Sequence, residues 1–130
     1  MDAGPALRIE PVGVAEREGD GWRTTWRLSN LAQTPVHIRG ATAPHSQFRG
    51  QAALALDVPA DGSATFSLSV AVDGVTGSEI ENAFLIVLAD IGDSPWRVLA
   101  RLRVSLEDRG RPSPRVETIT VQRVGFSGEL

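Results

Sequence analysis

The stretch W-R-V-L-A-R-L-R-V-S-L-E, residues 96–107, indicates the fold class of this chain most directly. From Val98 to Leu106 every second residue is apolar, and most of the residues between them are arginine or serine. Because side chains of an extended strand alternate between two faces, the stretch predicts a strand with one buried and one solvent-facing side. The same alternation recurs along the chain, which predicts an all-β protein.

Further strands are predicted wherever alternating or wholly apolar runs lie between turn residues. They cover residues 7–18 (interrupted at Pro11), 22–28, 35–38, 53–58, 66–72 and 83–91. In the second of these, Trp22 and Trp26 share one face and should anchor the core, because each buries a large apolar area. Residues 41–50 fit either a short edge strand or a long loop. The Ser78–Glu81 spacing has capping-box form, so at most one short helical turn is expected, near residues 78–82.

This pattern predicts an antiparallel two-sheet β-sandwich of about seven or eight strands. Over residues 7–107 it resembles the immunoglobulin-like and fibronectin-type-III-like sandwiches common in bacterial proteins. The resemblance is one of fold only, and it rests on the strand count, the polar segment at 78–81 before an apolar strand, and the expected hairpin at 92–95. The chain lacks the Cys-Trp-Cys pattern of antibody domains, and without tyrosine it has no tyrosine corner.

The length of 130 residues predicts one domain. We expect a flexible N-terminus over residues 1–6, the sandwich domain over 7–107, and a hinge rich in proline and glycine over 108–114. An additional strand or a partner-docking tail follows over 115–126, and residues 127–130 form the C-terminus.

Composition narrows the class of protein. The absence of cysteine excludes disulfides and thiolate chemistry, and all 13 basic residues are arginine. A net charge of −3 argues against nucleic-acid binding, which usually needs a basic surplus. No secretory signal and no apolar run of transmembrane length is found, so we expect a cytoplasmic protein without membrane contact.

Catalytic motifs are not evident, so we expect no enzyme, no catalytic residues, no metal and no cofactor. His37 and His45, together with a carboxylate such as Asp57, leave open a metal-assisted enzyme, although the spacing is not specific. Glu79 and Glu81 resemble a glycosidase pair only by residue type, because acidic residues also favour a helix N-terminus.

Arginines on the polar faces of two strands form the first functional candidate. They are Arg23 and Arg27 on the strand at 22–28, and Arg97, Arg101 and Arg103 on the strand at 96–107. Guanidinium groups pair bidentately with phosphate and carboxylate, so such a face predicts binding of an anionic small molecule or a glycan. The competing interpretation is that polar strand faces need solvated residues, and arginine is the cation this chain uses.

The segment 115–126 is the second candidate, because its apolar residues fall out of phase with one another. They are Val116, Ile119, Val121, Val124 and Phe126. A bulge, a change of sheet or docking on a second subunit would explain the change of phase. The preferred function is therefore a non-enzymatic protein-interaction module that binds a protein partner or itself through an edge strand and this segment. The arginine-bearing face is the alternative.

Overall fold

The computed structural model describes residues 4–124, which form nine strands and one 3-10 turn. The strands are β1 (Leu7–Pro11), β2 (Glu16–Glu18), β3 (Gly21–Asn30), β4 (Val36–His45), β5 (Phe48–Val58), β6 (Ser63–Val72), β7 (Glu79–Ile91), β8 (Ser94–Leu106) and β9 (Pro112–Arg123), with the turn η1 at Asp108–Gly110. Strands account for 72% of the structure, which confirms the all-β prediction. Within residues 4–124, no helix has the length and apolar character needed to cross a membrane.

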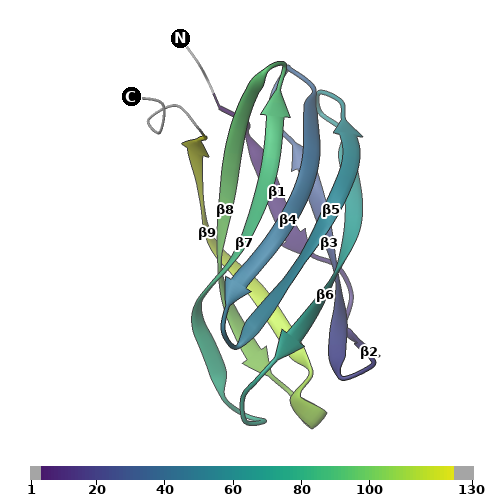
Figure 1. The fold of residues 1–130 in the computed structure, drawn as a ribbon, viewed down its shortest axis with the longest axis vertical. Coiled ribbons are helices and arrows are strands. Elements are labelled where there is room, and N and C mark those ends of the chain that lie inside the picture. The colour runs from purple at the N-terminus through teal and green to yellow at the C-terminus, as the bar shows by residue number, and fades with distance from the viewer. Residues whose placement is uncertain (1–3, 125–130) are drawn as a thin grey trace.

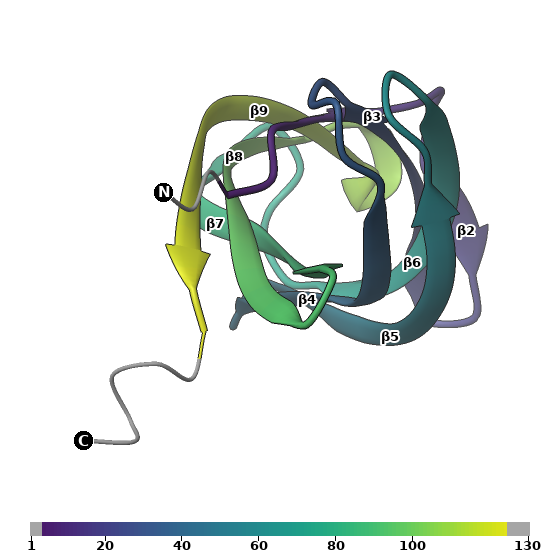
Figure 2. The same cartoon turned by 90° about the horizontal axis from the view of Figure 1, so that it is seen from above.

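The strands form one continuous sheet that curls into an almost closed ring, which we call the rolled sheet (Figures 1 and 2). Its order is β1-β3-β6-β5-β4-β7-β8-β9, with β2 pairing with β3 beside β1. Two clearly separate sheets were expected, and the structure instead has a barrel-like arrangement. The ring does not close, because β1 and β9 lie side by side at the two ends of the order without forming a ladder.

Alternating apolar residues fill the interior as the sequence predicts. On β8, Val98, Ala100, Leu102 and Val104 are fully buried, and on β3 Trp26 and Leu28 are fully buried while Trp22 is 8% exposed. Residues 83–89 of β7, apolar on both faces, lie in the middle of the sheet between β4 and β8. Burial of these side chains supplies the main driving force for folding.

The joint between β5 and β6 is narrow, because the two strands pair only through Phe48 with Val72 and Arg49 with Ala71. Beyond this joint the strands separate. A Cβ atom at Gly50 would collide with the backbone carbonyl oxygen of Ser69, so a side chain at residue 50 would prevent this close approach. Residues 41–50, whose structure the sequence left open, form the end of the β4–β5 hairpin that contains its turn.

The segment near 78–82 contains a bulge, and the helical turn that the sequence allowed there is not formed. The hydroxyl of Ser78 donates backwards to the carbonyl of Val75 at 2.5 Å, so it does not cap a following turn. Pairing with β8 begins at Glu79, and the register shifts between Ile80 and Ala83. Asn82 absorbs the shift with a φ of 58°.

The C-terminal segment pairs with its own chain, because β9 runs antiparallel along β8 from Pro112 to Arg123. The strand therefore begins inside the expected hinge at 108–114. Its register shifts opposite Arg101 and Leu102, where Glu117 is the extra residue. This bulge accounts for the change of phase between Val116 and Ile119.

Candidate functional site

The arginines on β3 face carboxylates on the neighbouring edge strands. Arg23 donates to Glu16 on β2, and its other Nη atom lies 3.9 Å from Glu18. Arg27 lies 3.7 Å from Glu10 on β1. Each of these arginines is therefore charge-matched within the sheet, and such exposed pairs contribute little stability.

A denser cluster surrounds Arg103 on the outer face of β8. Its Nε donates to Glu117 at 2.9 Å, and its Nη1 lies 3.1 Å from Glu79 and 3.4 Å from Glu81. Hydrogen bonds from Arg103 and then from Ser105 hold the pKa of Glu79 below its ordinary value, and the same carboxylates raise the pKa of Arg103. The three carboxylates neutralise the charge of Arg103, which weakens its attraction for an external anion.

The other two predicted arginines of β8 differ from each other. Arg101 donates to the side-chain oxygen of Asn82 at 2.8 Å and lies 3.8 Å from Glu117. Arg97 is exposed and forms no ion pair within residues 4–124. The five arginines thus lie on two separate strands, and the structure does not gather them into one pocket.

The apolar residues of the C-terminal segment also differ in their surroundings. Val116 and Ile119 are half-buried against the core, whereas Val121 is 38% exposed. Val124 is half-buried and its N–H donates to the carbonyl of Pro95 at 3.0 Å. Phe126 lies outside the described residues. Part of the predicted partner interface therefore packs on its own domain.

The two histidines lie at opposite ends of β4. His37 contacts Asp57 through an Nδ1–Oδ1 distance of 2.7 Å, and the side chain of Asp57 is 88% exposed. His45 accepts a hydrogen bond from the backbone N–H of Gln47 in the β4–β5 turn. The separation along one extended strand prevents both imidazoles from binding a single metal ion.

Two prolines remove backbone N–H donors from the free edge of β9. Leu106 donates to the carbonyl of Ser78 and accepts from the N–H of Gly77, so its backbone faces β7. Pro112 pairs opposite Leu106, and because backbone groups of a strand alternate in direction, its ring nitrogen faces away from β8. Pro114 has the same orientation, so this part of the edge lacks two N–H donors.

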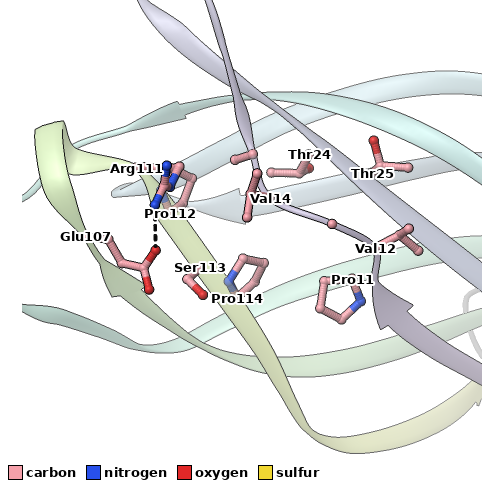
Figure 3. Close-up of a pocket in the computed structure, with 12 residues that line it drawn as sticks. Pro11, Val12, Val14, Thr24, Thr25, Glu107, Arg111, Pro112, Ser113 and Pro114 are labelled. Carbon is pink, nitrogen blue, oxygen red and sulfur yellow. Dashed lines mark hydrogen bonds and ion pairs between the residues drawn. The ribbon is translucent and has the colours of Figure 1, made fainter.

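The edge of β1 that faces β9 also lacks a backbone N–H donor. The N–H of Val12 donates to the carbonyl of Thr25 on β3, so the adjacent ring nitrogen of Pro11 faces the gap toward β9. Here the rolled sheet stays open around a cavity of about 200 Å³, the seam cavity (Figure 3). Its lining includes Pro11, Val12, Val14, Ala15, Pro112 and Pro114.

The free edge of β5 contains no proline that would remove an N–H donor. Gln47 accepts a hydrogen bond from the N–H of Asp73, so by alternation the backbone groups of Gln51 and Ala53 face the same side, where no ladder to β6 continues. No proline and no arginine occurs between residues 50 and 58. Leu54 and Leu56 are half-buried against the core. We call residues 50–58 the open β5 edge.

A second cavity, of about 560 Å³, adjoins the seam cavity and shares Ala15 and Arg111 with it. It is lined by one indole, three guanidinium groups and one carboxylate, from Trp22, Arg17, Arg109, Arg111 and Asp108. We call it the arginine pocket. The structure thus concentrates cations at a place different from the two predicted arginine faces.

Sequence reasoning missed both the open β5 edge and the arginine pocket. The signal for the edge was the proline-free run from 50 to 58, beside strands that do carry prolines. The signal for the pocket was weaker. Arg109 and Arg111 alternate with glycine in the expected hinge, but nothing local places them beside Arg17, about ninety residues earlier.

No protein-family model matches this chain, and no curated protein sequence matches it.

Proposed function

We propose that this chain is a non-enzymatic protein-interaction module that pairs with a second copy of itself through the open β5 edge. The observation that carries the proposal is the early end of the β5–β6 ladder, which holds only two residue pairs. Beyond them a run of β5 backbone donors and acceptors has no strand partner among the described residues. An unpaired strand edge is a template for strand addition.

The other free edges support this choice by contrast. Natural proteins protect strand edges with proline and with charged side chains. Both sides of the seam carry prolines whose ring nitrogens face the gap, whereas the open β5 edge has no proline and a single charged residue, Asp57, near its end. An incoming strand there would also cover Leu54 and Leu56, which are half-buried in the isolated chain.

A second copy fits the charges at the ends of β5. In an antiparallel pair of β5 strands centred on Ala53, the backbone of Arg49 stays paired with Ala71 of β6, and its side chain would lie near Asp57 of the other copy. Arg49 forms no ion pair within residues 4–124, and the Asp57 side chain, which contacts His37, is still 88% exposed. Opposite charges across a strand pair are favourable, and a twofold axis through the strand pair closes the assembly as a dimer.

The structure gives less support to the arginine faces and to the C-terminal segment as binding surfaces. Four of the five arginines on β3 and β8 face their own carboxylates, all but Arg97, which weakens the proposal of an anionic small molecule or glycan at those positions. The C-terminal segment pairs with β8 in its own chain. Of its predicted interface residues within 4–124, only Val121 is exposed, and it offers a surface contact.

We also propose that the fold of this chain is related to the immunoglobulin-like sandwiches. It is supported by the division of the strands into β1, β2, β3 and β6 on one side and β5, β4, β7, β8 and β9 on the other. These two groups connect only through the short β5–β6 joint.

Analytical ultracentrifugation of the wild type, Ala53→Arg and Thr120→Arg tests the self-pairing. Both residues are exposed on strands, so neither substitution touches the core. We expect a wild-type dimer that Ala53→Arg dissociates, because like charges meet near the twofold axis. Thr120→Arg on β9 should remain dimeric. A monomeric wild type, or a dimer that only Thr120→Arg dissociates, would contradict the proposal, and circular dichroism checks that each variant is folded.

A further inference from the structure

Arg17 is held in the arginine pocket in a position that leaves its outer donors available. Its guanidinium carbon lies 5.2 Å from the centre of the Trp22 ring, and its Nε donates to the carbonyl of Gly19 at 3.1 Å. A cation stacked on an aromatic face and tied at one nitrogen loses little further freedom on binding. No carboxylate lies within ion-pair distance of Arg17 in residues 4–124.

Arg109 occupies a position that an arginine does not favour. Its φ of 64° lies in the left-handed region, where glycine or asparagine would be less strained. The side chain is exposed, lines the arginine pocket and forms no ion pair within the described part of the chain. A strained backbone that presents an uncompensated cation to a cavity is a pattern associated with binding sites.

Arg111 supplies the third guanidinium and carries an unmatched donor. Its Nη2 donates to Glu107 at 3.2 Å (Figure 3), while its Nε is buried without a hydrogen-bond partner. A buried donor without an acceptor costs free energy. An anion that competes with Glu107 and draws the guanidinium into the pocket would give both nitrogens an acceptor.

We propose that the arginine pocket binds a small molecule through a phosphate or carboxylate group. Arg111 is paired with Glu107, whereas Arg17 and Arg109 form no ion pair within residues 4–124 and face one lining carboxylate, Asp108, so an oxyanion would improve the charge balance. The volume of about 560 Å³ is typical of small-molecule sites. A net charge of −3 over the chain disfavours long polyanions such as nucleic acid, which contact a wide surface.

Titration with inorganic phosphate and, separately, with citrate tests this site, with sodium chloride at matched ionic strength as the blank. The readout is the NMR shift of the arginine Nε–H groups and of the Trp22 indole N–H, assigned by substitution. We expect saturable shifts at Arg17, Arg109 and Arg111. Saturation by phosphate alone would identify a phosphoryl ligand, saturation by citrate alone would identify a carboxylate ligand, and either result supports the site.

Variants give the decisive comparison. Arg17→Gln and Arg109→Asn should each weaken binding roughly tenfold, the loss expected for one charge-assisted contact, and asparagine tolerates the left-handed backbone. Asp108→Asn should strengthen binding, and Arg97→Gln on the distant face of β8 should leave it unchanged. Absence of saturation, or equal affinity in Arg109→Asn and Arg97→Gln, would overturn the proposal. Ala53→Arg should bind as the wild type does, because this site is independent of self-pairing.

Discussion

The indole N–H of Trp26 donates a hydrogen bond of 2.8 Å to the hydroxyl of Thr24, two residues earlier on the buried face of β3. The Thr24 hydroxyl in turn donates to the carbonyl of Leu68 on β6 at 2.9 Å. Trp26 is fully buried and Thr24 is 3% exposed, so both polar groups depend on this chain of bonds. The core therefore accepts a tryptophan because a threonine satisfies its only polar atom.

Replacing Thr24 with valine tests that relationship. The shape is almost conserved, but the indole N–H loses its acceptor, so the unfolding free energy should fall by about 1–3 kcal/mol. Urea denaturation measures the change. Thr25→Val is the matched control, because Thr25 makes only a 3.5 Å contact with Ser67 on the outer face. Equal stability of the two variants would show that the buried bonds contribute nothing specific.

Gly50 should tolerate no side chain, because a Cβ there would collide with the Ser69 carbonyl. Gly50→Ala forces β5 and β6 apart at their joint, and overpacking of this kind costs about 1–3 kcal/mol. Thermal unfolding measures the loss. The conservative control is Ala52→Gly, which removes a methyl group two residues along the same strand without crowding β6. A stability of Gly50→Ala equal to that of the wild type would mean that the joint is loose.

The Glu79–Arg103 pair should make stability depend on pH. Hydrogen bonding to Arg103 lowers the pKa of Glu79, so the folded chain holds the carboxylate form more strongly than the unfolded chain does. This contribution is complete above the ordinary carboxyl pKa and is lost as the pH falls through the lowered one. The stability difference between wild type and Glu79→Gln should therefore be constant at neutral pH and shrink in acid.

Denaturation in urea at a series of pH values measures that difference. Asp93→Asn serves as the reference, because Asp93 is exposed and forms no ion pair within residues 4–124. A difference that stays the same from neutral to acidic pH would contradict the assigned role of the pair. High salt should reduce the effect at every pH, since the pair lies at the surface.

The sequence predicted the inward faces of β3, β6 and β8 because burial imposes a period of two that is visible in the residues themselves. The residues between the predicted strands 53–58 and 66–72 form a tight turn, in which the N–H of Gly62 donates to the carbonyl of Pro59 at 2.9 Å. Curling of the sheet was not predictable, because closure depends on strand twist and on contacts between β1 and β9, which are far apart in the chain.

The candidate sites were less predictable than the strands. Arg23 and Arg103 were correctly placed on outer faces, but their carboxylate partners come from other strands whose register the sequence does not state. The arginine pocket joins Arg17 to the turn after β8, and only the curled sheet brings these segments together. The local pattern predicts the face of the strand on which a side chain lies, but its contact partners depend on how the strands are arranged in the fold.

Restoring a backbone donor at the seam should increase association. Pro114→Thr adds an N–H on the free edge of β9, and an edge with its donors restored pairs more readily with another strand. The β9 edge of one molecule would then pair with an edge other than β9 on the next molecule. Such a head-to-tail contact is not limited to a closed dimer, so larger assemblies should form. Static light scattering over time measures them, with Pro59→Ala in the β5–β6 turn as control. Unchanged scattering would show that proline does not protect this seam.

Amide hydrogen exchange at two protein concentrations can detect pairing through the open β5 edge residue by residue. We expect the N–H groups of Gln51 and Ala53 to gain protection as the concentration rises, because they acquire strand partners only in the dimer. Amides of β9 that face the seam should exchange at the same rate in both samples. If Gln51 and Ala53 exchange at identical rates in dilute and concentrated protein, although the measured mass doubles between the two, the dimer does not form through β5.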